Sequence, residues 1–191
     1  MLMRVLLINN AEKPRREFVK PIELLFRKKG IPFDTIEYSE LPEAGLPRYG
    51  AIVSSASPRG DDIVDGHAKF YAWIRTTDIP FLGICAGHQI IGKLFGAQLI
   101  QNSEQEIGDL PIYVDVNDPI FAGLGKTFLV RQGHNDAITL PEEFVLLAHS
   151  DKCKIQVMKH RLNPIYTCQF HAEILNPDFI LNFIQSHLLS H

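Results

Sequence analysis

Cysteine is scarce in this chain of 191 residues, and its scarcity argues against two kinds of protein. The three cysteines, Cys85, Cys153 and Cys168, are an odd number at scattered positions, unlike the disulfide framework of a small secreted domain. No two of them form a C-x-x-C pair, which is the usual spacing of zinc ligands. We therefore expect no metal site, and no cofactor is expected either.

Long apolar runs and a strong net charge are also missing. The apolar start MLMRVLLINN is too short to span a membrane and lacks the charged region and cleavage site of a signal peptide. A formal net charge of −3 and a pI near 6.2 provide no basic surface for nucleic acid or anionic lipid. We expect a cytoplasmic protein with neither a nucleic-acid nor a membrane partner.

The first half of the chain alternates apolar strands with amphipathic helices. Strands are expected at residues 4–8, 31–38, 50–54 and 79–84, and helices at 17–29, at 66–76 and directly after Cys85. Apolar strands separated by helices are typical of a parallel sheet covered on both faces.

The second half instead contains short strand candidates separated by turn residues, at 110–116, 127–133, 144–150, 154–160 and 164–170. A final helix is expected from the Asn176-Pro177 pair, since Asn caps helices and Pro favours their first turn. We predict one α/β domain over residues 1–191. It has three layers around a mostly parallel central sheet, plus a small antiparallel strand region.

Cys85 stands between the strand at 79–84 and the helix that follows it, in the stretch FLGICAGHQ. Sites of open parallel sheets lie at the carboxyl ends of strands, and a residue on so tight a turn needs small neighbours, here Gly83 and Gly87. The positive end of the following helix favours a thiolate. The amide of Ala86 is placed to stabilise an oxyanion. A buried structural cysteine is the alternative, because most free cysteines are core residues.

A nucleophilic cysteine needs a base, and His171 is the best candidate among the eight histidines. It follows an apolar strand in IYTCQFHAE, and Glu173 lies two residues on, where it can accept one imidazole proton. This is the arrangement of a nucleophile, base and orienting group. His88 is expected to hold the turn by a local hydrogen bond. Surface positions are expected for His67, His160, His187 and His191.

GICAGHQ at 83–89 and QFHAE at 169–173 resemble the two signature motifs of the class I, triad-type glutamine amidotransferases. The resemblance extends over nearly the whole chain and includes an oxyanion loop at 52–58, EIG at 106–108 and a substrate-side loop, GHND, at 133–136. His134, Asp136 and the stretch 141–160 are similar to the glutaminase subunits of GMP synthetases. The family fold is a three-layer α/β domain, in agreement with the pattern of strands and helices.

The resemblance implies an activity for these residues. Cys85 would attack the side-chain amide of glutamine to form a γ-glutamyl thioester. His171, oriented by Glu173, would protonate the leaving ammonia and activate water, and the amides of Ala86 and Ser57 would form the oxyanion hole. The substrate contacts would come from Ala56, Gln89, Gly133, His134, Asn135 and Asp136.

Two further features bear on this activity. The family's oxyanion loop usually reads Ser-Gly-Gly-Pro, but here it reads Ser-Ala-Ser-Pro at 55–58. A residue with a Cβ is strained where φ is positive, so low basal activity is expected if Ala56 or Ser57 occupies such a position. No phosphate-binding G-x-x-x-x-G-K-[S/T] loop is present. The ammonia acceptor is therefore expected to be a synthetase on another chain.

Two other functions stay open at this stage. The chain could be a free-standing hydrolase of a γ-glutamyl amide other than glutamine, because such enzymes share the Cys/His arrangement. It could instead be a non-catalytic module of the same fold, although such a module has no need for Cys85, His171 and Glu173 together.

Overall fold

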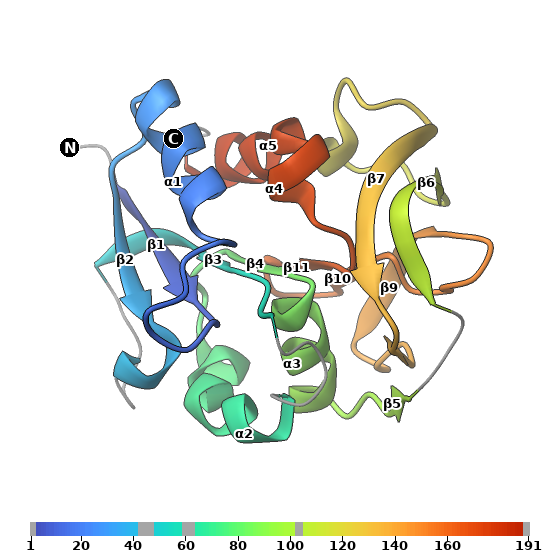
Figure 1. Cartoon of the computed structure of the whole chain (residues 1–191), viewed down its shortest axis with the longest axis horizontal. Helices are drawn as coiled ribbons and strands as arrows, with labels where there is room; N and C mark the ends of the chain where they lie inside the picture. The colour runs from blue at the N-terminus through green and yellow to red at the C-terminus, as the bar shows by residue number, and fades with distance from the viewer. Residues whose placement is uncertain (1–2, 42–47, 59–63, 102–104, 189–191) are drawn as a thin grey trace.

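The computed structural model describes residues 3–41, 48–58, 64–101 and 105–188. These residues build a nine-stranded sheet in the order β2-β1-β3-β4-β11-β10-β9-β6-β7. Helices cover both of its faces (Figure 1). The predicted three-layer α/β architecture with a parallel core is confirmed.

Five strands form the parallel half of the sheet, which we define as β2-β1-β3-β4-β11. Their bounds are Arg4–Asn9 for β1, Phe33–Glu37 for β2, Tyr49–Ser54 for β3, Phe81–Ile84 for β4 and Ile165–Cys168 for β11. Every residue of β3, β4 and β11 is buried, because helices cover both faces there. This explains why these strands are continuous apolar runs in the sequence.

The antiparallel half continues the same sheet through β10, β9, β6 and β7. Its strands are β6 (Glu106–Val114), β7 (Thr127–His134), β9 (Phe144–His149) and β10 (Val157–His160). These strands lie at four of the five strand candidates predicted for the second half of the chain, although β6 begins at Glu106 rather than at residue 110. A separate two-stranded sheet joins β5 (Leu99–Ile100) to β8 (Ala137–Ile138). Both strands escaped prediction because two residues show no alternation.

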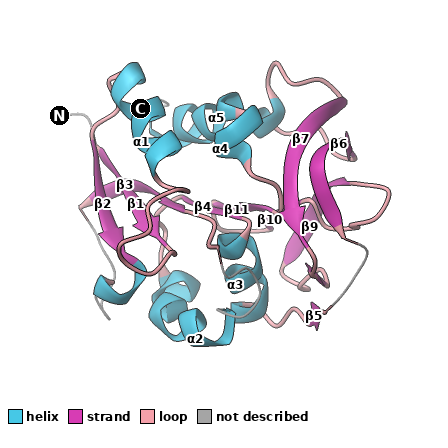
Figure 2. Cartoon of the chain, in the orientation of Figure 1, coloured by secondary structure: helices cyan, strands magenta, loops and turns pink. Residues whose placement is uncertain are grey.

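Three helices cover one face of the sheet: α1 (Lys20–Lys29), α4 (Ala172–Leu175) and α5 (Pro177–Leu188). The other face is covered by α2 (Val64–Ala68), the 3₁₀ helix η3 (Lys69–Thr76) and α3 (Ala86–Leu94) (Figures 1 and 2). Shorter 3₁₀ helices lie at Tyr38–Glu40 (η1) and Pro119–Phe121 (η4). α1 begins three residues later than predicted, and the helix expected at 66–76 is instead a short α-helix followed by η3. None of the helices described is both long and apolar enough to cross a membrane.

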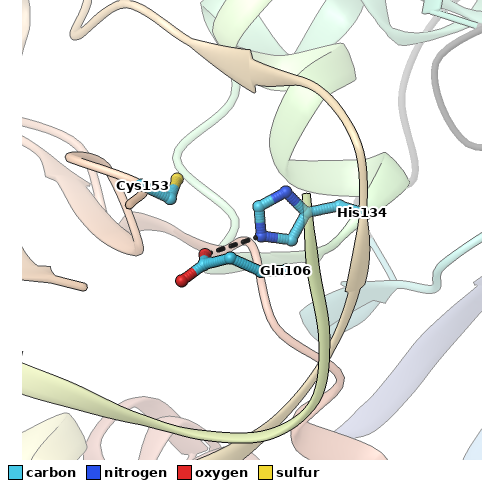
Figure 3. A group of neighbouring side chains, drawn as sticks. All are labelled: Glu106, His134 and Cys153. Atoms are coloured by element: carbon cyan, nitrogen blue, oxygen red, sulfur yellow. Dashed lines mark hydrogen bonds and ion pairs between the residues drawn. The ribbon is translucent and has the colours of Figure 1, made fainter. Parts of the chain in front are cut away.

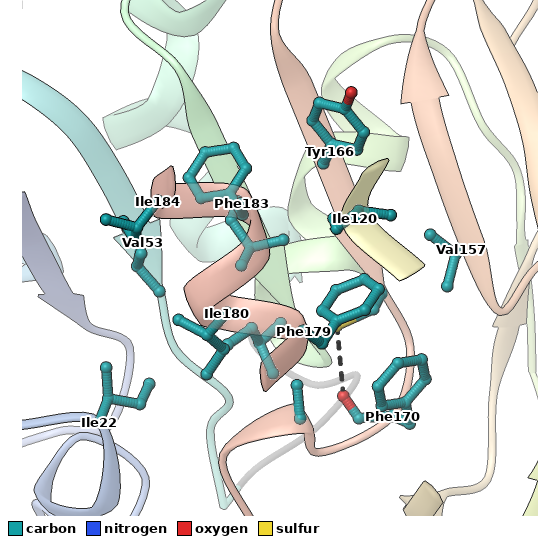
Figure 4. Close-up of a cluster of buried hydrophobic side chains, with 14 of the residues drawn as sticks. Ile22, Val53, Ile120, Val157, Tyr166, Phe170, Phe179, Ile180, Phe183 and Ile184 are labelled. Carbon is teal, nitrogen blue, oxygen red and sulfur yellow. Dashed lines mark hydrogen bonds between the residues drawn. The ribbon is translucent and has the colours of Figure 1, made fainter. Parts of the chain in front are cut away.

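Two hydrophobic cores follow from these layers, and β1 shows how they are divided. Its alternate residues Val5 and Leu7 pack into the core under α1 and α5, whereas Leu6 and Ile8 pack into the core under α3 and η3. Figure 4 shows part of the first core, where Phe179 and Phe183 of α5 lie over the sheet. The sheet is thus held rigidly from both sides, which positions the ends of its strands.

Candidate active site

Cys85 occupies the sharp turn between β4 and α3. Its φ of 50° and ψ of −99° make it the one non-glycine residue with positive φ in the described ranges, a conformation that costs of order 1–3 kcal/mol. A Cβ on Gly83 would lie 2.7 Å from the carbonyl oxygen of Gly87, and a Cβ on Gly87 would lie 2.9 Å from that of Ser54. The two glycines are therefore required by close backbone contacts at the turn.

The cysteine and the histidine meet because β4 and β11 are neighbours. Ile84 at the end of β4 pairs with Cys168 at the end of β11, and the Cys85 N–H donates to the Cys168 carbonyl at 2.8 Å. His171 follows β11 three residues later and interacts with Cys85. Parallel strands end at the same edge of a sheet, so residues far apart in the sequence reach one site.

Glu173 orients the imidazole of His171. The Nδ1 of His171 lies 2.9 Å from Oε1 of Glu173, and the glutamate side chain is fully buried. Phe18 stacks on the imidazole with ring centroids 5.5 Å apart and an angle of 26° between the rings. With Nδ1 engaged by the carboxylate, Nε2 remains for the nucleophile. Phe18 carried no signal in the sequence, because nothing local indicates that it would reach His171.

Cys85 and Glu173 together favour the charged form of the His171 imidazole. Burial lowers the pKa of His171, but the negative charge of a Cys85 thiolate, hydrogen bonding to that sulfur and the contact with Glu173 outweigh burial and raise the pKa to about 10. A histidinium beside a thiolate is the state in which a cysteine is a competent nucleophile and the histidine can protonate a leaving group.

The oxyanion loop at 55–58 is held by a buried network centred on Asn10. The Asn10 Nδ2 donates to the Ser54 hydroxyl at 2.8 Å and to the Ser55 carbonyl at 2.5 Å, and its backbone N–H donates to Ser55 Oγ at 3.2 Å. Tyr71 donates its hydroxyl proton to Asn10 Oδ1 and contacts Ser54. Asn10 follows β1 at the same sheet edge as Cys85, and this position in the sequence could have indicated its role.

Neither Ala56 nor Ser57 has a positive φ in this structure. The loop therefore adopts the observed conformation without backbone strain, so the condition under which low basal activity was expected is not met in this conformation. The side chain of Ala56 is buried in the hydrophobic core, so only its backbone can face a substrate. Ser57 is also buried, and Ala86 opens α3, where helix amides have no acceptor within the helix.

Gln89 lies on α3 and is linked to the nucleophile through a second glutamine. Its Nε2 donates to Gln169 Oε1 at 3.4 Å, and Gln169 Nε2 lies 3.8 Å from the sulfur of Cys85. Oε1 of Gln89 has no hydrogen-bond donor among the described residues. Gln169 belongs to the QFHAE motif, but its contact with the cysteine was not foreseen.

Comparison with known proteins gives the family. The model of the class I glutamine amidotransferase family matches residues 18–186. The chain belongs to this family. It is 34% identical to a glutamine-hydrolyzing GMP synthase subunit of Thermoplasma acidophilum over 96% of this chain and 92% of the relative, and 32% identical to the corresponding protein of Methanosphaera stadtmanae over 90% and 89%.

Solved structures agree with this membership. A crystal structure of a GMP synthase subunit protein from T. acidophilum matches with a TM-score of 0.83 and 27% identity, covering 96% of this chain and 93% of that one. A glutamine amidotransferase from Thermotoga maritima shares the fold, with a TM-score of 0.75 at 22% identity over 96% and 82%. The prediction of a class I glutamine amidotransferase is confirmed.

In this amidotransferase the segment 133–136, which was predicted to face the substrate, lies beside His171 at the end of β7. The position of a Cβ on Gly133 lies 3.3 Å from His171 Nε2, so a glycine leaves the imidazole free of contact there. Asn135 is exposed and accepts a hydrogen bond from Gln105 at 2.6 Å. Asp136 is buried, and its carbonyl lies 3.0 Å from His134 Nδ1. Their predicted contacts with substrate stay predictions.

The side chain of His134 contacts Glu106. Its Nε2 lies 3.1 Å from Oε2 of Glu106, and both side chains are 2% exposed. Together with Cys153, these two residues form a buried group of three potential metal ligands. No spacing in the sequence indicated this group, because its members come from three separate segments.

The remaining histidines were only partly foreseen. His88 is fully buried on α3, its Nδ1 lies 2.7 Å from Thr167 Oγ1, and burial lowers its pKa to about 3, so it is a neutral structural residue. His67 and His160 were expected at the surface but are buried. Tyr38 stacks on His67, and Phe95 and Phe144 pack against His160. His187 is half-buried, and His191 lies outside the described residues.

Proposed function

We propose that this amidotransferase is the glutaminase subunit of a two-chain GMP synthase, formed by one domain over residues 1–191 and working in the cytoplasm. It hydrolyses glutamine to glutamate and passes the ammonia to a synthetase subunit. The observation that carries the chemistry is the placement of Cys85 on its strained turn beside the His171–Glu173 pair, whose atoms are 2.9 Å apart. The acceptor is proposed from the similarity to the two GMP synthase proteins of T. acidophilum and M. stadtmanae.

The reaction proceeds in two steps on these residues. The thiolate of Cys85 attacks the amide carbon of glutamine, and His171 gives its proton to the departing ammonia, which leaves a γ-glutamyl thioester. His171 then takes a proton from water, and the resulting hydroxide attacks the thioester carbonyl and releases glutamate and the thiolate. Glu173 holds the imidazole in one orientation and stabilises its charged form throughout.

Negative charge develops on the carbonyl oxygen in both steps. The Ala86 N–H at the start of α3 is the first proposed donor to this oxyanion, and the Ser57 N–H is the second. The unpartnered Oε1 of Gln89 is an acceptor for the ammonium group of the substrate, since a buried oxygen without a donor is costly. With the loop 133–136, Gln89 would hold the amino-acid head of glutamine.

Release of glutamate and ammonia from glutamine tests the activity. Cys85→Ser is expected to lower kcat by at least about 10³-fold, because the hydroxyl is a far weaker nucleophile at neutral pH. Cys168→Ala is the matched control, since Cys168 is a buried cysteine on the neighbouring strand whose pKa is raised by burial, and it should retain nearly full activity. Equal rates for wild type and Cys85→Ser would refute the mechanism.

A panel of other γ-glutamyl amides tests the alternative of a free-standing hydrolase, which would prefer one of them to glutamine.

Reconstitution with the synthetase subunit from the same organism tests the acceptor. Wild type should support GMP formation from glutamine, whereas Cys85→Ser should support it only when ammonia is added. GMP formation that needs ammonia even with the wild-type chain, despite measurable glutaminase activity, would reject GMP synthase as the acceptor enzyme and leave the glutaminase assignment standing.

A further inference from the structure

We propose that Glu106, His134 and Cys153 form a binding site for a transition-metal dication, with zinc as the best-fitting ion. One ligand atom from each residue lies within 4.8 Å of the others, and all three residues are buried. Figure 3 shows them approaching from β6, from the end of β7 and from the loop between β9 and β10. A carboxylate oxygen, an imidazole nitrogen and a thiol sulfur make up a donor set typical of zinc.

The spacing of the ligands is close to what a shared ion requires. The Nε2 of His134 and Oε2 of Glu106 are 3.1 Å apart, whereas a tetrahedral ion with bonds of about 2.0–2.1 Å separates such atoms by roughly 3.3 Å. The sulfur of Cys153 lies within 4.8 Å of the other two ligand atoms, and rotation about its Cα–Cβ bond can adjust its position. Its present partner is the Ile155 carbonyl at 3.6 Å, which is a weak contact to give up.

The outer contacts of the group resemble those of metal centres. A ligating histidine usually donates its other ring N–H to a carbonyl or carboxylate, and His134 Nδ1 lies 3.0 Å from the Asp136 carbonyl. Ligating carboxylates are usually hydrogen-bonded too, and Glu106 Oε1 accepts from Ser150 at 2.7 Å. These contacts fix the orientation of two ligands before any ion binds.

A cation also completes the hydrogen bonding of this cluster. His134 faces an acceptor on each side, the Asp136 carbonyl and the Glu106 carboxylate, and a neutral imidazole can donate to only one of them. An ion between Nε2 and the carboxylate makes both contacts favourable at once. Gln156 also contacts the cluster, since its Nε2 donates to Oε2 of Glu106 at 2.8 Å.

The site would be structural, because its three ligands are buried. His134 is the last residue of β7 and follows Gly133, which borders the catalytic imidazole. A bound ion would tie this end of β7 to β6 and to the Cys153 loop. The inference does not depend on the identity of the ammonia acceptor.

Metal titration of untagged protein in the Cys85→Ala background tests the site, since this variant removes the other thiol that could bind an ion. We expect one equivalent of Co²⁺ to bind with a thiolate-to-cobalt charge-transfer band in the near ultraviolet, and Zn²⁺ to displace it. Adding Cys153→Ser to Cys85→Ala should abolish the band and weaken zinc binding by more than about 100-fold. Loss of a residue that only hydrogen-bonds to a ligand weakens metal binding by about 10- to 100-fold. Adding Cys168→Ala to Cys85→Ala should change neither the charge-transfer band nor the zinc affinity.

A thermal measurement keeps the test decisive if Cys153→Ser is unstable. At a hundredfold excess over its Kd, zinc should raise the Tm of the Cys85→Ala protein by at least about 5 °C. The absence of saturable binding and of any Tm shift would overturn the proposal. So would a charge-transfer band that survives Cys153→Ser or disappears with Cys168→Ala.

Discussion

The parallel and antiparallel halves of the sheet contribute different things to the site. The parallel half carries the proposed reacting groups, because Cys85, His171 and the proposed oxyanion loop all follow strands that end at one edge. The antiparallel half provides support: the His171 N–H donates to the Arg131 carbonyl of β7 at 2.8 Å, and Gly133 borders the imidazole. Changes in the first half should therefore affect chemistry, and changes in the second should affect stability and positioning.

The largest effect is expected from Glu173→Gln in the parallel half. An amide at this position favours the wrong tautomer of His171 and does not stabilise its charge, so kcat for glutaminase should fall by about 10³-fold or more with little change in KM. The exposed Glu142→Gln in the antiparallel half is the control and should keep wild-type activity. A loss below about tenfold for Glu173→Gln would mean that the carboxylate does not orient the base.

The charge state of His171 tests the electrostatics of the parallel half. Wild type should keep the imidazole protonated until the pH approaches about 10, because the thiolate and Glu173 together outweigh burial. In Cys85→Ser the pKa of His171 should fall well below that value, since burial then acts against a weaker attraction. NMR titration of the ring proton measures this. An unchanged pKa in Cys85→Ser would show that the thiolate does not cause the shift.

Glu106→Gln in the antiparallel half should mainly affect stability. The carboxylate accepts hydrogen bonds from Ser150 and Gln156 in a buried setting and faces His134. Measured by denaturant unfolding in the presence of a chelator, the change should lower the free energy of unfolding by roughly 1–3 kcal/mol. Asp109→Asn on the same strand is the exposed control and should change stability little. Equal stability of both variants would contradict the support role.

Gly133 lies where the antiparallel half contacts His171, and Gly133→Ala should cause a moderate loss of activity. The added methyl would lie 3.3 Å from His171 Nε2, so the imidazole must move by a few tenths of an ångström. We expect kcat to fall by roughly tenfold, because catalysis is sensitive to such displacements. Gly66→Ala is the control, since a Cβ there meets nothing within 4 Å. A fully active Gly133→Ala enzyme would show that His171 has more freedom than its contacts indicate.

Ser57→Gly should have the smallest effect, and it tests whether the oxyanion loop must rearrange. If the active loop needs a positive φ at residue 57, glycine should raise basal glutaminase activity several-fold, because the cost of that conformation falls by about 1 kcal/mol. If the observed loop is already active, the rate should stay the same. The assay is glutamate release without the synthetase subunit, with the exposed Ser39→Gly as a comparison outside the loop.

Much of the parallel half could be predicted from its sequence. Strands buried on both faces are continuous apolar runs, and the glycines around Cys85 are a local requirement of the turn. The antiparallel half was predicted less well, since β6 was expected to begin at residue 110, and β5 and β8 of the separate two-stranded sheet were missed. Half-exposed and very short strands leave a weaker pattern, since neighbours distant in sequence decide which side is buried.

The sequence by itself determined the fold class and pointed to Cys85, His171 and Glu173 as candidate site residues, because the glycine-flanked turn and the short spacing between His171 and Glu173 are local properties, although Glu173 lies in the first turn of α4 and not in extended chain. Only the tertiary structure decided what surrounds them. Asn10 reaches the oxyanion loop, Phe18 covers the base, and Glu106, His134 and Cys153 converge from three segments. Such contacts depend on strand order and register, which no local pattern encodes.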